Sequence, residues 1–278
     1  MATYASRPAW GLRTRAFTSS WLTVPAGLGA LVVVSLLLRT TELSIGFWID
    51  EGLSVGIADR PLSDIPFALR EDGSPPLYYM LLHFWLDIAG RSEAGVRGLS
   101  LLCALLAIPA GFWAGRQIWG TQRAGWFAAV LMAFNPFLGQ YAQEARMYSL
   151  VALLAIPATT CFIKAYALET ENRRPWIAGF AVSVAVALYT HNWPIFFTIS
   201  AAVAWVLLWV LAERERRRQL FRDALLGFGG LLVLYLPWIP TTLYQAAHTG
   251  APWSDAPAVG SLLSVPGTLL GRMPEIAA

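Results

Sequence analysis

The sequence predicts an all-α membrane protein: a polytopic bundle of about seven transmembrane helices with a long first extracytoplasmic loop carrying short interfacial helices. Two observations support this fold class. Of the 278 residues, 56% are hydrophobic and only 13% are charged, whereas a soluble domain carries about 25% charged residues. The apolar residues also stand in long blocks, with arginines gathered between alternate blocks. Little of the chain is left for a soluble domain.

Seven apolar segments approach the length of a membrane crossing, which is about 20 residues for a helix. They are residues 21–38, 98–114, 124–137, 150–168, 176–189, 195–212 and 224–239. The first is long for the apolar part of a cleaved secretory signal and is followed by further spans. We therefore expect it to be an uncleaved signal anchor.

The arginines predict the orientation of these spans. Clusters precede the first span and follow the second, fourth and sixth: Arg7, Arg13 and Arg15; Arg116 and Arg123; Arg173 and Arg174; Arg214, Arg216, Arg217, Arg218 and Arg222. If the N-terminus is cytoplasmic, every cluster falls on the cytoplasmic side, as the positive-inside rule requires. The sequence thus predicts a multi-pass protein of the cell (plasma) membrane with a cytoplasmic N-terminus.

The apolar segment 75–86 is too short for a crossing, and counting it as one would move the later arginine clusters outside. We interpret it as an interfacial or re-entrant helix, because its Tyr, His and Trp suit the headgroup zone. Residues 41–97 then form one long outer loop, with short helices expected at 51–58, 61–69 and 75–88. The unusual polar residues of the chain all map to this outer side.

Asp50 and Glu51 follow directly on Phe47-Trp48-Ile49 at the start of this loop. Placing ionisable groups beside a bilayer costs free energy, so we take the pair as a candidate functional site. The alternative is a solvated loop pair, but the apolar flanks hold these carboxylates at the membrane surface. A positioned carboxylate there is suited to act as a general base towards a hydroxyl group.

Two arginines at the outer ends of spans are candidates for binding a phosphate. Arg97 precedes the second span, and Arg146 stands in the segment Gln143-Glu144-Ala145-Arg146-Met147-Tyr148. A guanidinium group forks bidentately onto phosphate, and a lipid phosphate would sit at this depth. For the second segment, a self-satisfied pair between Glu144 and Arg146 is the alternative.

Four further residues are weaker candidates for substrate binding. Ser74, Tyr78 and Tyr79 lie in an acidic, proline-containing turn that enters the apolar segment 75–86. A helix start with Ser74 as N-cap and Pro75 as first residue explains the serine and prolines equally well. His191 stands at a helix end, where a lone histidine is more often structural than a ligand.

Several classes of site are not indicated. Cys103 and Cys161 fall inside apolar spans, where a cysteine behaves as a small hydrophobe. No Cys/His spacing suggests zinc, no P-loop is present, and no other ligand cluster indicates a cofactor or a divalent metal. The arginines at 214–218 are interpreted as a topology anchor with lipid-headgroup contacts, not as a nucleic-acid site.

The order of these motifs resembles a known pattern. An aromatic residue with Asp50-Glu51 opens the first outer loop, Pro-Pro-Leu-Tyr-Tyr follows at 75–79, then Ser92, Glu93 and Arg97, then Asn-Pro at 135–136 and Gln-Glu-Ala-Arg-Met-Tyr at 143–148. This resembles the GT-C superfamily of polytopic glycosyltransferases, in particular the bacterial family 39-like enzymes akin to protein O-mannosyltransferases and lipid A aminoarabinose transferase. The resemblance covers residues 20 to 245, the N-terminal catalytic module.

The resemblance implies a function. Such enzymes transfer a sugar, mannose-like or other, from a polyprenyl-phosphate carrier to an acceptor hydroxyl on the outer face of the membrane, with inversion. It implies Asp50 as the base, Glu51 as the residue that orients it, and Arg97 and Arg146 on the donor phosphate. The partners implied are the polyprenyl-phosphate sugar donor, membrane lipid, and an acceptor protein, lipid or polysaccharide. Metal dependence varies among relatives.

The chain departs from this pattern in three respects. Relatives often place a basic residue or His before Pro-Pro, where this chain has Ser74. Some relatives carry an Asp in the second outer loop, where this chain offers Glu144. Family members are usually longer, so we expect residues 1–245 to be the catalytic module and 246–278 an extracytoplasmic loop that starts a missing C-terminal part. A transporter or flippase for a lipid-linked or small polar substrate, or a non-catalytic fragment, are the alternative functions.

Overall fold

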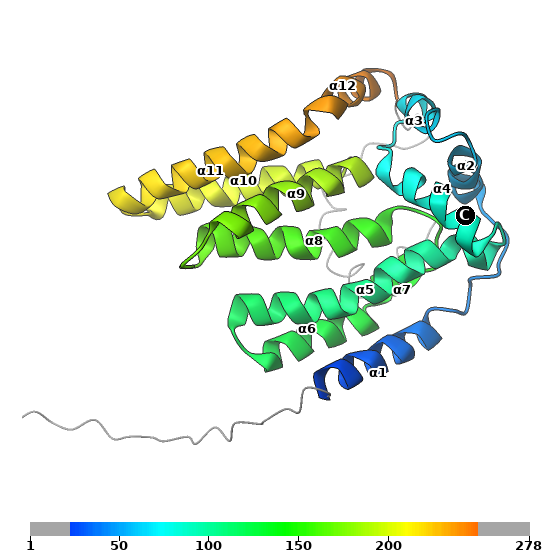
Figure 1. Cartoon of the computed structure of the whole chain (residues 1–278), viewed down its shortest axis with the longest axis horizontal. Coiled ribbons are helices and arrows are strands. Elements are labelled where there is room, and N and C mark those ends of the chain that lie inside the picture. The colour runs from blue at the N-terminus through cyan, green and yellow to red at the C-terminus, as the bar shows by residue number, and fades with distance from the viewer. Residues whose placement is uncertain (1–22, 250–278) are drawn as a thin grey trace, which may run out of the picture.

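The computed structural model describes residues 23–249, and helices are the only regular secondary structure in that range. The longer helices lie side by side along the long axis of the molecule (Figure 1). They are α1 (Thr23–Leu38), α5 (Glu93–Trp119), α6 (Gln122–Phe134), α8 (Tyr148–Phe162, continued by the π-helical turn Ile163–Ala167), α9 (Arg174–Thr190), α10 (Pro194–Leu211) and α11 (Arg214–Tyr235). The polytopic all-α bundle predicted from the sequence is confirmed.

Helices occupy all seven predicted spans, but they differ in length. Four are long and apolar enough to cross a membrane: Glu93–Trp119, Tyr148–Ala167, Pro194–Leu211 and Arg214–His248. The helices at the other three predicted spans, α1, α6 and α9, are shorter. The count of seven crossings therefore stays a prediction.

Helix ends differ from the predicted span bounds at α5 and α6, for identifiable reasons, and α11 starts at Arg214, ten residues before the predicted 224. Helix α5 starts at Glu93, five residues before the predicted 98, because Ser92 caps it by accepting a hydrogen bond from the N–H of Gly95. Helix α6 stops at Phe134, because Asn135 caps a separate helix, α7 (Pro136–Tyr141), and Pro136 has no N–H to continue the ladder. Arg97 consequently lies inside a helix and not in the loop that precedes it.

The predicted outer loop does carry three short helices, α2 (Ile49–Ala58), α3 (Ile65–Asp72) and α4 (Leu77–Ala89). They gather at one end of the bundle, which we call the loop end (Figure 1). Each exposes large apolar side chains, for example Ile49, Phe67 and Ile88, which are 74–80% exposed. Exposed apolar surface beside a membrane-spanning bundle suits helices that lie in the interface.

A buried cluster holds the loop end together. Ile65, Tyr78, Tyr79 and Leu82 are buried, and they belong to a cluster that joins α2, α3 and α4 to α5 and to the start of α8. A second cluster packs α8, α9, α10 and α11 around Tyr166 and Phe180. The loop end is therefore packed against the bundle through buried apolar side chains.

Small residues allow α5 and α6 to approach closely. A Cβ on Gly115 would lie 2.5 Å from the carbonyl oxygen of Ala124, and one on Gly125 would lie 2.8 Å from that of Phe112. Interfaces between membrane helices commonly use such small residues to bring backbones together. Beyond this pair, Arg39 is buried at the end of α1 and donates to the carbonyl of Met132 at 2.7 Å, which caps the interrupted end of α6.

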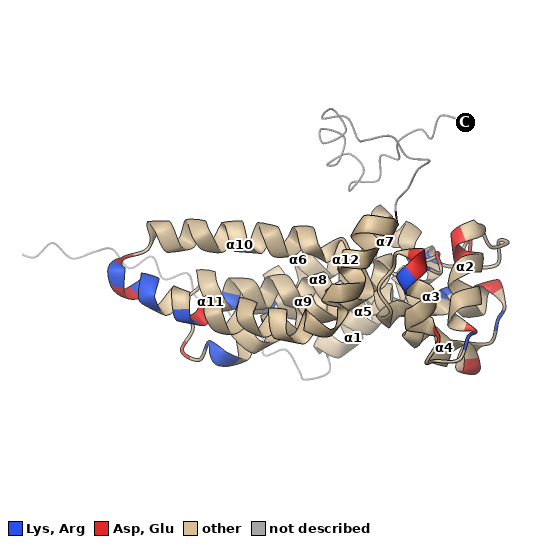
Figure 2. Ribbon diagram, turned by 90° about the horizontal axis from the view of Figure 1, so that it is seen from above, with Lys and Arg blue, Asp and Glu red and all other residues tan. Residues whose placement is uncertain are grey.

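Charge is distributed unequally along the bundle. Basic residues gather where α10 joins α11, and acidic residues lie around α2 and α4 at the opposite end (Figure 2). We call the end of the bundle where α10 joins α11 the basic end. The predicted final loop, 246–278, lies almost wholly outside the described residues. Helix α12 (Ile239–His248) follows a 3-10 turn at Leu236–Trp238, so the helical chain continues beyond the predicted last span and includes the first three residues of the predicted loop.

Candidate active site

A buried ion pair anchors the first loop to α5. Glu51, on α2, is fully buried, and it accepts hydrogen bonds from Arg97 Nε at 2.8 Å and Nη2 at 2.6 Å, the bidentate arrangement. The N–H of Ala145 donates to the same carboxylate at 2.7 Å. Burial alone would raise the pKa of Glu51, but the hydrogen bonds from Arg97 and Ala145 outweigh it and hold the pKa below its usual value.

Arg97 has no free N–H group in this arrangement. Besides Glu51, it donates to four backbone carbonyls of the loop that precedes α2, namely those of Glu42, Leu43, Ile45 and Gly46. Its side chain is 5% exposed. A guanidinium has five N–H donors, and these contacts engage all of them, so the geometry favours Arg97 as an organiser of the loop over the phosphate ligand suggested by its position in the sequence.

Asp50 lies on a different side of α2 from Glu51, as consecutive residues of a helix do. Its side chain is 36% exposed, and Oδ2 lies 3.7 Å from Arg146 Nη2. Its backbone carbonyl accepts a hydrogen bond from the hydroxyl of Ser54 at 2.8 Å. Two adjacent carboxylates therefore have opposite environments, one enclosed and saturated, the other open to a ligand.

Arg146 is held loosely. Its Nη1 lies 3.4 Å from both the Asp50 carbonyl and the Ser54 hydroxyl, and its guanidinium is centred 5.9 Å from the ring of Tyr148. Its Nε is buried and has no hydrogen-bond partner among the described residues. The alternative of a self-satisfied Glu144–Arg146 pair is not found, because the ion pair of Arg146 is with Asp50. A partly buried cation with spare donors is suited to bind an anion.

Tyr78 is linked to the backbone of Arg146 through Ser100. The hydroxyl of Tyr78 lies 3.0 Å from that of Ser100, which in turn donates to the backbone carbonyl of Arg146 at 3.0 Å. Both tyrosines are buried, and burial raises the pKa of each phenol. Tyr78 thus positions the Arg146 backbone through Ser100, a role that the sequence alone did not suggest.

His191 ends α9 beside the same arginine. Its ring lies 5.8 Å from that of Tyr148, and its Nδ1 accepts the N–H of Trp193 at 2.9 Å, which leaves Nε2 as the protonated nitrogen of the neutral ring. Burial, together with the positive charge of Arg146, lowers its pKa to about 4. His191 is therefore a neutral hydrogen-bond donor near neutral pH.

The turn that carries Ser74 is clamped from two sides. Gln245, buried on α12, donates through Nε2 to the carbonyls of Leu69 at 2.9 Å and Ser74 at 3.2 Å. Asn192 donates to the carbonyl of Gly73 at 2.9 Å. Ser74 is not a helix cap, because α4 begins at Leu77 with Pro76 as N-cap. Nothing in the sequence around Gln245 indicated this contact.

Glu144 is half-buried and interacts electrostatically with Glu51 and Arg97. The amide of Gln140 donates to it at 3.5 Å. Burial raises its pKa, and the negative charge of Glu51 adds to this. No group of three or more His, Cys, Asp or Glu side chains is placed to hold a metal ion among the described residues.

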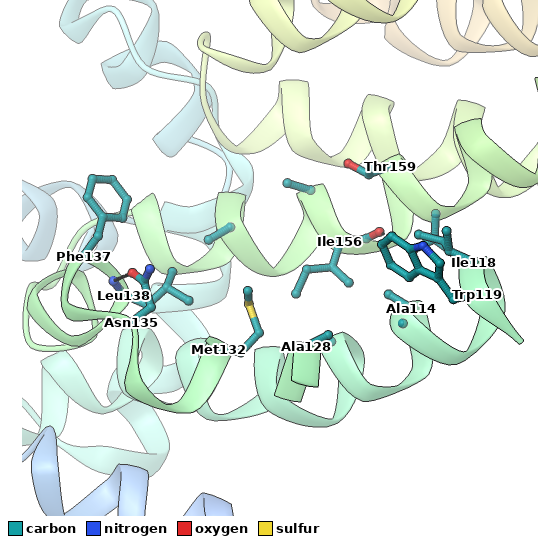
Figure 3. A pocket seen from close by; sticks show the side chains of 15 residues that line it. Ala114, Ile118, Trp119, Ala128, Met132, Asn135, Phe137, Leu138, Ile156 and Thr159 are labelled. Atoms are coloured by element: carbon teal, nitrogen blue, oxygen red, sulfur yellow. Dashed lines mark hydrogen bonds between the residues drawn. The ribbon is translucent and has the colours of Figure 1, made fainter. Parts of the chain in front are cut away.

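An apolar groove of about 430 Å³ lies between α5, α6 and α8. Trp119 and Ile118 stand at one end, and Asn135, Phe137 and Leu138 at the other (Figure 3). The second end lies on α7, in the segment that leads along the chain to Glu144 and Arg146. A groove with this lining is suited to an extended hydrocarbon chain.

Three solved structures share this fold. ArnT from Cupriavidus metallidurans in the apo state gives a TM-score of 0.65 at 17% identity, covering 87% of this chain and 48% of that chain. The same protein bound to undecaprenyl phosphate gives 0.61 at 18%, covering 81% and 42%. The S. cerevisiae protein O-mannosyltransferase Pmt1-Pmt2 complex bound to the sugar donor gives 0.59 at 13%, covering 80% and 34%. This chain thus spans between a third and a half of their length.

The fold is that of the GT-C superfamily of polytopic glycosyltransferases, as the resemblance in the sequence implied. A search of curated proteins found no match. The model of the dolichyl-phosphate-mannose-protein mannosyltransferase family matches residues 73–241, and the chain belongs to that family. Arg97, Arg146 and His191 lie inside the matched segment, whereas Asp50 and Glu51 precede it.

Proposed function

We propose that this protein transfers a sugar from a polyprenyl-phosphate carrier to an acceptor hydroxyl, with inversion, and that the loop end faces the outside of the cell. The family it belongs to is one of glycosyltransferases, which favours this over a transporter. The observation that carries the proposal is the difference between the two adjacent carboxylates. Glu51 forms a buried ion pair with Arg97, whereas Asp50 is partly exposed and lies beside Arg146, whose Nε has no hydrogen-bond partner among the described residues.

In the proposed reaction, the Asp50 carboxylate accepts the proton of the acceptor hydroxyl as its oxygen attacks the anomeric carbon. The bond between that carbon and the phosphate oxygen breaks, and the electron pair leaves with the polyprenyl phosphate. Attack opposite to the leaving group inverts the anomeric centre. Arg146 neutralises the charge that develops on the departing phosphate, with the neutral Nε2–H of His191 as a further donor.

The apolar groove supplies a place for the carrier chain. It ends at α7, and α7 leads to Arg146, so a lipid in the groove would direct its phosphate towards the loop end. One of the similar ArnT structures is bound to undecaprenyl phosphate, which makes this lipid a reasonable first probe. The sugar and the acceptor, whether protein, lipid or polysaccharide, are to be identified by experiment.

The test is Asp50→Asn in the purified full chain. Mass spectrometry of co-purifying lipid first identifies the loaded carrier, and release of free polyprenyl phosphate is then followed with that donor. We expect turnover to fall by at least ~100-fold, the usual contribution of a general base. Asp64→Asn, an exposed carboxylate in the same loop, is the control and should behave like wild type. Wild-type turnover in Asp50→Asn would show that Asp50 is not the base.

A further inference from the structure

The arginine-rich start of α11 is divided between two roles. Arg216 Nη2 donates to the carbonyl of Tyr166 at 3.0 Å. Arg217 donates to the carbonyls of Ala212 at 2.8 Å and Val210 at 2.6 Å, which caps the end of α10. These two arginines therefore have a structural task at the basic end.

Arg218 and Arg222 have no such task. Both are exposed, and neither side chain has a hydrogen-bond or ion-pair partner in the part of the chain that the structure describes. They stand four residues apart on α11, so they share one face of the helix. Like charges at this spacing destabilise a helix slightly, and an anion placed between them would remove that cost.

Two hollows meet at these arginines. A polar hollow of about 520 Å³ is lined by Arg218 and Arg222 together with Glu215, Gln219 and Asp223. An adjoining apolar hollow of about 290 Å³ is lined by the same two arginines with Trp209, Arg217 and Phe221. Phe221 is 57% exposed. The polar hollow suits the headgroup of a phospholipid, and the apolar hollow suits the part of an acyl chain nearest to that headgroup. The two guanidinium groups lie between them.

The charge of the polar hollow also fits an anion. Of its two acids, Asp223 is already paired with Arg173 at 3.4 Å, so Glu215 alone opposes the two free arginines. Arg222 lies about two turns into α11, beside apolar residues such as Leu225 and Leu226 that continue along the helix. The arginines thus stand at the boundary between the polar and the apolar part of α11, where lipid phosphates lie.

We propose that Arg218 and Arg222 form a binding site for one anionic phospholipid, with its phosphate between the two guanidinium groups and a chain over Trp209 and Phe221. The site lies at the opposite end of the bundle from the candidate active site and is independent of sugar transfer. Such a lipid would fix the junction of α10 and α11 at the membrane surface.

The test titrates the delipidated full chain in neutral detergent with phosphatidylglycerol, and native mass spectrometry counts the bound lipid. Phosphatidylcholine with the same chains is the neutral lipid, and inorganic phosphate is the free anion. Since each surface arginine near an anionic lipid contributes roughly a fivefold factor, Arg218→Gln with Arg222→Gln should weaken phosphatidylglycerol binding about 30-fold on that basis. Glu215→Gln should tighten it.

The matched control is Arg123→Gln with Arg174→Gln, which removes two exposed arginines from the same end of the bundle. This control should retain the wild-type affinity. An equal loss in both double variants would show a general effect of charge and overturn the site. Phosphatidylcholine binding as tightly as phosphatidylglycerol, or inorganic phosphate displacing the lipid at equal concentration, would overturn it as well.

Discussion

The loop end contains two arginine–carboxylate pairs that differ in almost every physical respect. Glu51 and Arg97 are buried, bidentate and saturated, with 2.6 Å between Oε2 and Nη2. Asp50 and Arg146 are 3.7 Å apart at their closest charged atoms, and Arg146 Nε has no partner among the described residues. Neighbouring carboxylates on one helix thus have different environments: the first pair fixes the loop to α5, and the second is the pair that the proposed reaction uses.

Adjacency in sequence is therefore a poor guide to shared function. A buried ion pair carries a desolvation cost that only good geometry and extra hydrogen bonds offset, and Arg97 obtains these from four loop carbonyls. A pair that must exchange partners during a reaction cannot be satisfied to the same degree. Incomplete bonding at Arg146 is consistent with that requirement.

The largest expected effect comes from breaking the closed pair. Arg97→Leu leaves the Glu51 carboxylate buried without its partner, which typically costs ~3–5 kcal/mol. We expect a large fall in the apparent Tm in detergent and protease cleavage within residues 41–97. Arg91→Leu, which removes an exposed ion pair with Asp59, should change stability by no more than about 1 kcal/mol. If Arg97→Leu melts like wild type, the pair is not what anchors the loop.

The distinction between these pairs could not be predicted from the sequence. The bundle, the three loop helices and the placing of Asp50 and Arg146 on the same side of the bundle follow from apolar block length, turn residues and helix ends. The saturation of Arg97 could not be predicted because it depends on α5 starting at Glu93, about one turn earlier than hydropathy suggests, and on the contacts of its side chain with Glu51 and the loop carbonyls. Gln245 was missed because its partners lie more than 170 residues away, and no local pattern encodes such a contact.

A smaller effect is expected from the open pair, and on a different measurement. Arg146→Gln removes charge-assisted hydrogen bonds to a bound phosphate, each worth ~1.5–3 kcal/mol, so undecaprenyl phosphate should bind about 10- to 100-fold more weakly on that basis. Binding is measured as stabilisation of the melting transition by added lipid. The lipid-free Tm should change little, because the contacts of Arg146 in this structure are long. Unchanged lipid binding would remove Arg146 from the proposed donor site.

The last expected effect, the smallest for a change of one pH unit, is a difference in pH dependence between the regions around the two pairs. The pKa of His191, beside Arg146, is lowered from 6.5 to about 4. Between pH 6.5 and pH 4, His191 is therefore protonated in the unfolded chain but not in the folded chain. Stability should therefore fall as the pH is lowered from about 6.5 to about 4, by up to ~1.4 kcal/mol per pH unit.

Glu51, whose folded pKa is lowered below 4.5, loses its contribution only when the pH falls below that value. Glu144, whose pKa is raised, acts in the opposite direction. Thermal melts of wild type and His191→Asn, which keeps an acceptor for the N–H of Trp193, separate these contributions. The variant should lose the decline in stability between pH 6.5 and 4.5, where the opposite contribution of Glu144 remains, and keep the decline below pH 4.5. A variant that retains the full slope above pH 4.5 would show that another group titrates there.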